Sequence, residues 1–286
     1  MATFMYRALP VHYELYGKGD PVLLIHGLGC SGDDWTLQIA ALKSVAHLIV
    51  PDLPGCGATP PPRGGYSIRG AATLLWALLD DLRVTRPNIV GFSMGGAIAL
   101  EMALQRPARV AHLALINSLG SYHGNWHKWL YARMSAAMIR LLGMHDAAII
   151  SAAALFPKPS QGPLRERAVA EFTAVPAREY LQMANALEEW SITQELNQIK
   201  SRILIIAAEH DHTPLSEKLS LAKRLHANIA VVRGSRHGTP FDASDATNAC
   251  LIALLRDQAL PASDQLICDA TVGGKYLKTI ANGTPC

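Results

Sequence analysis

Short apolar runs alternate with amphipathic stretches over the first 119 residues and again after residue 198. Residues 22–25 and 47–50 form two such runs, which are apolar enough to be strands buried on both faces. Residues 68–82 place leucines at three- and four-residue steps, which predicts an amphipathic helix. This alternation predicts an α/β fold with a mostly parallel central sheet and helices on both faces.

The alternation stops between residues 120 and 198, where no run of strand type is present. Apolar side chains there recur at helical spacing, so we predict an all-helical cap inserted into the α/β core. The predicted core comprises residues 1–119 and 199–260. Residues 261–286 have no clear period, and two interpretations of this extension stay open: a poorly ordered segment, or a segment that docks a partner or second subunit.

One strand-to-helix junction carries a motif with chemical consequences. Gly91, Ser93 and Gly95 form a G-x-S-x-G pattern that follows an apolar run and precedes a stretch of helix-forming residues. In that context the serine lies on a sharp turn that presents its hydroxyl beyond the sheet. The backbone N–H of Met94, at the start of the following helix, is placed to stabilise a developing negative charge.

A serine hydroxyl needs a base, and the base needs an acid to orient it. In parallel sheets these partners lie on loops beyond the carboxyl ends of later strands, in the order serine, acid, histidine. His237 and Asp211 occupy two such loops. Glu209 is the rival acid, and Asp211 is preferred because it lies deeper in its loop, directly before a predicted helix.

A glycine-rich loop follows the first buried strand. It contains His26, Gly27 and Leu28. The glycines allow the backbone to approach a substrate, so the Leu28 N–H is a candidate second donor to an oxyanion. We interpret the His26 ring as a support for this loop and not as a catalyst.

Composition narrows the classes of function. The formal net charge is +3, and no run of Lys or Arg indicates binding to nucleic acid or to an anionic membrane. No secretory signal and no uncharged apolar stretch of membrane-spanning length is evident. The five cysteines are scattered without metal-ligand spacing, so we expect no metal and a reduced cytoplasmic setting.

Five ordered motifs resemble those of the α/β-hydrolase fold superfamily. They comprise the loop at His26, residues 52–57, the turn around Ser93, the loop at residues 209–211, and Arg236 with His237. The chain resembles small bacterial serine esterase-like hydrolases that carry a helical lid. The resemblance implies that Ser93 is the nucleophile, His237 the base and Asp211 its partner, that Leu28 and Met94 form the oxyanion hole, and that no cofactor takes part.

The expected activity is cleavage of carboxylic esters of small-to-medium apolar substrates through an acyl-enzyme on Ser93. Trp126, Trp129 and Met134 in the cap are the expected substrate-binding residues, and the expected partner is a small ester or lactone. Three alternatives stay open: a C–C bond hydrolase, an enol-lactonase of aromatic degradation, or a ligand-sensing protein that acts through a partner. For assembly we expect a monomer or a homodimer.

Overall fold

The computed structural model describes residues 2–123 and 126–269, and the side chains of residues 126–132 and 268–269 lie outside this description. A single sheet of nine strands forms the centre, in the order β1-β2-β4-β3-β5-β6-β7-β8-β9. The strands are β1 (Ala2–Tyr6), β2 (Leu9–Tyr16), β3 (Pro21–Ile25), β4 (His47–Pro51), β5 (Asn88–Phe92), β6 (His112–Ile116), β7 (Arg202–Ala208), β8 (Asn228–Val232) and β9 (Leu266–Asp269).

The helices in chain order are α1 (Thr36–Leu42), α2 (Ile68–Asp81), α3 (Met94–Gln105), α4 (Trp126–Leu155), α5 (Gly162–Ala174), α6 (Ala177–Glu189), α7 (Leu215–Leu225), α8 (Thr239–Asp242) and α9 (Ser244–Leu255). Short 3-10 turns η1 (Gly32–Trp35), η2 (Pro159–Gln161) and η3 (Leu196–Gln198) join some of them. The first of these turns is capped by Ser31, whose side chain accepts a hydrogen bond from the Asp33 N–H.

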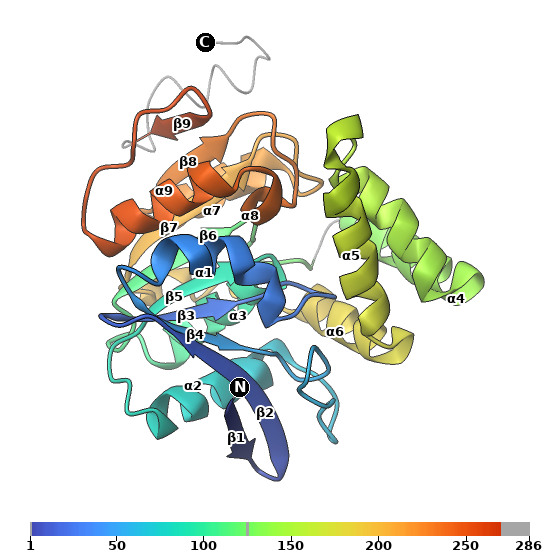
Figure 1. Cartoon of the computed structure of the whole chain (residues 1–286), viewed down its shortest axis with the longest axis horizontal. Coiled ribbons are helices and arrows are strands. Elements are labelled where there is room, and N and C mark those ends of the chain that lie inside the picture. The colour runs from blue at the N-terminus through green and yellow to red at the C-terminus, as the bar shows by residue number, and fades with distance from the viewer. Residues whose placement is uncertain (1, 124–125, 270–286) are drawn as a thin grey trace.

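The six strands from β4 through β8 in the sheet order run parallel, and antiparallel strands flank them. Apolar residues of each parallel strand alternate between two clusters. Leu23 and Ile25 face the side of α2, α3 and α7, whereas Val22 and Leu24 face the side of α1 and α9. Figure 1 shows these helices on opposite faces of the sheet. The predicted mostly parallel sheet covered on both faces is confirmed.

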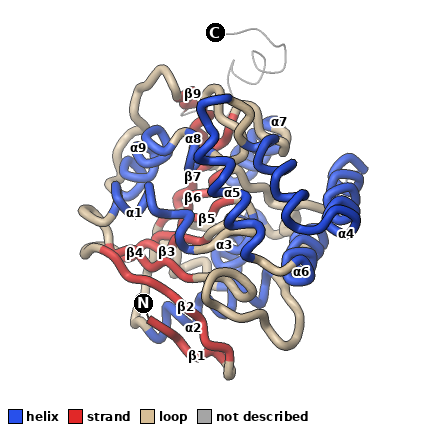
Figure 2. The backbone as a smooth tube through the Cα atoms, turned by 45° about the vertical axis from the view of Figure 1, so that its right-hand side comes forward, coloured by secondary structure: helices blue, strands red, loops and turns tan. Residues whose placement is uncertain are grey.

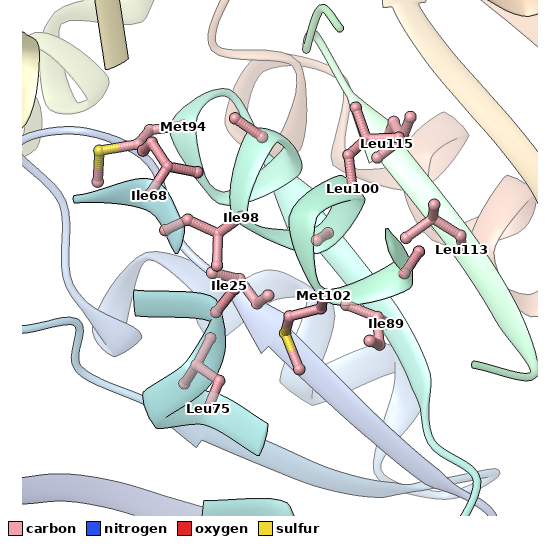
Figure 3. Packing of buried hydrophobic residues seen from close by; sticks show 14 of the residues in the cluster. Ile25, Ile68, Leu75, Ile89, Met94, Ile98, Leu100, Met102, Leu113 and Leu115 are labelled. Carbon is pink, nitrogen blue, oxygen red and sulfur yellow. The ribbon is translucent and has the colours of Figure 1, made fainter. Parts of the chain in front are cut away.

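The contact between α3 and the sheet is apolar on every side. Ile98 and Met102 of α3 pack with Ile25, Ile89 and neighbouring leucines, all of which are buried (Figure 3). The helix that follows Ser93 is therefore held in the centre of the core. A helix without a polar face fits this position because both the sheet and α2 cover it.

The described residues between 120 and 198 (120–123 and 126–198) form only helices and turns, apart from one isolated bridge between Ser121 and Ser191. Figure 1 shows α4, α5 and α6 beside the core, and Figure 2 shows α5 in front of the ends of the strands. The insertion begins and ends at one place, where the Ile192 N–H donates to the Gly120 carbonyl at 3.0 Å. This helical segment is the cap expected from the sequence.

The longest cap helix, α4, is interrupted at Gly143, whose φ of 84° is not helical. By length and composition its segment Arg133–Leu155 is apolar enough to cross a membrane, which differs from the expectation drawn from the sequence. Only 22% of its most apolar window is buried. Leu141 is 82% exposed and Met134 63%. Length and composition alone are weak support for a membrane segment, and the Gly143 break divides the helix into two shorter pieces.

The extension contributes one strand to the core. Residues Leu266–Asp269 form β9, which pairs antiparallel with β8 and covers that edge of the sheet. The sequence showed no strand there because four residues are too few to give a readable period. Residues 270–286 lie outside the described part of the chain, so the two interpretations of that segment stay as predictions.

Candidate active site

Ser93 lies in a strained turn between β5 and α3. Its φ of 52° and ψ of −116° place a non-glycine residue in a region that L-residues rarely adopt. Steric limits require glycine on both sides of this turn. A Cβ on Gly91 would lie 2.3 Å from the Gly95 oxygen, and a Cβ on Gly95 would lie 2.1 Å from the Ile25 oxygen. The turn is therefore possible only with the small residues that the motif supplies.

Three side chains from distant parts of the chain meet at this turn. The Ser93 Oγ lies 2.9 Å from His237 Nε2, and His237 Nδ1 lies 2.8 Å from Asp211 Oδ1. Glu209 instead accepts a hydrogen bond from the Gly234 N–H at 2.8 Å. The geometry thus brings together Ser93, His237 and Asp211 and leaves the rival acid outside. In this arrangement the histidine can take the serine proton while the carboxylate stabilises the resulting imidazolium.

Asp211 has no exposed side-chain surface, and it is surrounded by donors. Thr213 donates from its hydroxyl to Oδ2 at 2.9 Å and from its backbone N–H to Oδ1 at 3.2 Å. Burial raises the pKa of Asp211, but His237 and the buried Lys218 ammonium, which contacts Oδ2, outweigh that effect and hold it below its ordinary value. The carboxylate therefore stays ionised and oriented.

The loop after β3 is braced by His26, which is fully buried. Its Nε2 accepts a hydrogen bond from the Leu53 N–H at 3.0 Å, so the proton resides on Nδ1, which donates to the Gly27 carbonyl at 2.9 Å. Burial lowers the pKa of His26, consistent with a neutral ring. His26 thus ties the Leu28 loop to the chain after β4, and it does not contact Ser93.

A cavity opens beside Ser93 and His237. Leu28 lies on its wall, and Met94 is the first residue of α3, where backbone N–H groups have no partner within the helix. The cap contributes one face of α5 at helical spacing, together with Leu155 and Phe156 at the end of α4. The α5 residues are Leu164, Arg167, Ala168, Glu171 and Phe172.

Met134 is not among the described residues that line this cavity, and its expected role in substrate binding stays a prediction. It is 63% exposed, because this part of α4 lies on the outer side of the cap, whereas α5 faces the cavity. Trp126 and Trp129 begin α4, and their side chains lie outside the described residues. Their expected role therefore stays a prediction.

Besides Ser93 and His237, the cavity wall carries acidic and basic side chains at Asp34, Arg167 and Glu171. Asp34 is 5% exposed, and burial raises its pKa to about 7 against smaller opposing effects of Cys30 and Arg167. Arg167 lies 3.7 Å from Asp34 and 5.7 Å from the centre of the Phe241 ring. Glu171 accepts a hydrogen bond from the Ser31 hydroxyl at 3.1 Å. Arg167 and Glu171 come from α5 of the cap and Asp34 from η1 of the core, so the cluster places polar groups where the two meet.

Ligand atoms of Asp211, His212 and His237 lie within 4.8 Å of one another, a spacing that a metal ion can bridge. The donor set does not fit one. Asp211 Oδ2 already contacts the Lys218 ammonium, and Oδ1 accepts a hydrogen bond from His237. A metal ion would therefore be repelled by the ammonium, and both carboxylate oxygens are already engaged. These residues fit proton transfer instead.

Comparison with known proteins identifies the family. The family model described as alpha/beta hydrolase fold matches residues 20–224. The chain belongs to the alpha/beta hydrolase fold family. Among curated relatives of this hydrolase, RutD of Stutzerimonas stutzeri, named as a proposed carbamate hydrolase, is 31% identical over 87% of this chain and 97% of its own. RutD of Caulobacter vibrioides NA1000 is 30% identical over 86% of this chain and 95% of its own.

Solved structures of low identity share the hydrolase fold. The enol-lactonase of Burkholderia xenovorans LB400 has a TM-score of 0.82 at 22% identity, covering 89% of this chain and all of that one. An esterase of Exiguobacterium antarcticum has a TM-score of 0.83 at 20% identity, covering 89% and 98%. The match to the family model ends before His237, so the position of that residue rests on the geometry described above.

Sequence reasoning missed several residues that position the hydrolase site. Asn117 follows β6 and donates from Nδ2 to the His237 carbonyl at 2.8 Å, while its Oδ1 accepts from the Ala208 N–H at 2.7 Å. It therefore joins the loops that carry Asp211 and His237. Its position directly after a buried strand was the available signal. Lys218 gave no signal, because a lysine in a helix is usually exposed.

Proposed function

We propose that this chain hydrolyses small-to-medium carboxylic esters or lactones through an acyl-enzyme on Ser93. The observation that carries the proposal is the pair of hydrogen bonds from Ser93 Oγ to His237 and from His237 to Asp211. In the proposed reaction His237 takes the proton of Ser93 as its oxygen attacks the carbonyl carbon. The alcohol leaves with that proton, and water activated by His237 then releases the acid.

The N–H groups of Leu28 and Met94 are the proposed donors to the negative oxygen that forms during attack. Support comes from the position of Leu28 on the cavity wall and of Met94 at the first turn of α3. Donors held in place before the reaction stabilise the transition state more than the substrate. The mostly apolar lining of the cavity suits a substrate with an apolar acyl or alcohol part.

Labelling with a fluorophosphonate and turnover of p-nitrophenyl esters of increasing chain length test the proposal. Wild-type protein should be labelled at Ser93, and Ser93→Ala should lose both labelling and turnover while retaining its unfolding transition. Ser220→Ala is the matched control, since that serine is exposed on α7. Labelling at another residue, or turnover retained by Ser93→Ala, would show that the assigned nucleophile is wrong.

A second candidate is carbamate hydrolysis through the same serine. Two observations favour it: the near full-length similarity to RutD proteins, and the polar groups of Asp34, Arg167 and Glu171 in the cavity, which can bind the N–H and C=O groups of a carbamate. Measuring kcat/KM on a matched pair, an aryl acetate and the corresponding aryl carbamate, separates the two. Faster turnover of the carbamate would indicate that carbamates, and not esters, are the preferred substrates.

A further inference from the structure

Lys218 forms an unusual ion pair behind the site. It lies on α7, and neither its side chain nor that of Asp211 is exposed. Its ammonium contacts Asp211 Oδ2 and donates to the Thr213 carbonyl at 3.3 Å. Lysines are almost never fully buried unless they are paired, because removing an ammonium from water is unfavourable by several kcal/mol. Burial lowers the pKa of Lys218, and Asp211 opposes that change.

The ion pair is not required to supply Asp211 with donors. The hydroxyl and N–H of Thr213 and the ring of His237 already provide three neutral or switchable donors to the two oxygens. What Lys218 adds is a fixed positive charge. It fixes Oδ2, which leaves Oδ1 directed at His237, and it neutralises part of the carboxylate charge that His237 experiences.

We propose that Lys218 is a positioning residue that acts through Asp211 to orient His237 and to extend activity to lower pH. The proposal rests on the hydrolysis proposed above. At rest, the charges of Asp211 and Lys218 cancel and the His237 ring is neutral. When His237 takes a proton, the group of three carries a net positive charge. Because like charges repel, the fixed charge of Lys218 disfavours a further positive charge on this group, and we expect its loss to move the acid limb of the activity profile to higher pH.

Other groups around this pair act in both the presence and the absence of Lys218. His212 lies against His237, with ring centres 4.2 Å apart, and its Nδ1 is 3.2 Å from Asp211 Oδ1. Glu217 interacts electrostatically with Lys218, and Tyr122 with Asp211. Because these groups are unchanged when only Lys218 is replaced, a comparison of variants at that position isolates its charge.

The test is the rate of fluorophosphonate labelling of Ser93 between pH 5 and 9, with Lys218→Met, Lys218→Arg and Lys223→Met compared with wild type. Lys223 lies exposed on the same helix and serves as the control. Lys218→Met should shift the midpoint of the acid limb upward by about one pH unit, the size expected for removal of a nearby charge. At pH values well below both midpoints, the labelling rate of Lys218→Met relative to its own high-pH plateau should then be about tenfold lower than the same ratio for wild type. Lys218→Arg and Lys223→Met should keep the wild-type midpoint.

The outcomes separate the two proposals. Wild-type protein that is not labelled at Ser93 would overturn the proposed function and this inference with it. If wild type is labelled and Lys218→Met loses rate equally at every pH, Lys218 has a structural role only and the inference is wrong. If Lys218→Met lacks a cooperative unfolding transition, Lys218→Gln replaces it, because glutamine keeps a donor to Asp211 without the charge. The shift of the acid-limb midpoint is then judged in the same way. A midpoint that moves in Lys218→Arg also contradicts the inference.

Discussion

The buried carboxyl of Asp34, which lines the cavity, leads us to predict how the stability of the fold depends on pH. The carboxyl is 5% exposed, and burial raises its pKa from 3.8 to about 7. In the unfolded chain this group ionises at a much lower pH than in the fold. The folded state therefore binds more protons between these two values, and stability falls as pH rises through that window. Above pH 8 the full penalty for a buried carboxylate is present.

The change to make is Asp34→Asn, which removes the ionisation and keeps the shape. The pKa difference of about three units corresponds to about 4 kcal/mol in total, because each unit is worth about 1.4 kcal/mol. About 3 kcal/mol of that falls between pH 5 and pH 9, since the unfolded carboxyl is already mostly ionised at pH 5. Asp34→Asn should thus gain stability relative to wild type by about this amount over that range.

Urea unfolding followed by tryptophan fluorescence measures the effect at pH 5, 7 and 9. Groups that titrate alike in both proteins cancel in the difference between their free energies of unfolding. Asp33→Asn is the control, because Asp33 is the exposed neighbour in the same turn. A difference between Asp34→Asn and wild type that stays constant from pH 5 to pH 9 would refute the reasoning, since Asp34 would then ionise alike in the folded and unfolded states.

Two further predictions concern the turn and the cavity. Gly95→Ala should prevent folding, because the added Cβ would lie 2.1 and 2.6 Å from two backbone oxygens. The measurement is the yield of folded protein. Gly64→Ala is the control and should fold normally, because no atom lies within 4 Å of its added Cβ. Phe156→Ala should widen the cavity and raise the ratio of kcat/KM for p-nitrophenyl octanoate over acetate by about tenfold, the order of effect of one or two methylenes in a pocket. An unchanged ratio would show that Phe156 does not limit the acyl chain.

The core and the meeting of Ser93, Asp211 and His237 were predictable because local patterns determine them. Strands buried on both faces have continuous apolar runs, and a loop directly after such a strand must lie at the carboxyl edge of the sheet. Asp211 and His237 each follow a strand of this kind. The choice of Asp211 over Glu209 required only its depth in the loop, and the structure places Asp211 beside His237.

The substrate-facing residues were less predictable, because they depend on how the cap packs on the core. A helical stripe shows that one face is apolar, but it does not show what that face contacts. Met134 belongs to such a stripe and is exposed, whereas Arg167 and Glu171, which are charged, face the cavity. Both side chains are half-buried, and they contact Asp34 and Ser31, residues more than a hundred positions earlier in the chain. Local sequence patterns do not predict contacts between residues so far apart in the chain.

The junction at Gly120 and Ile192 has a consequence for how this enzyme can be altered. Because the two ends of the inserted helices are hydrogen-bonded neighbours, the core would need only a tight connection to close without them. Ser93, Asp211 and His237 all lie on loops of the core. Exchanging the helical insertion between relatives at this junction is therefore a direct way to measure how much it contributes to substrate preference.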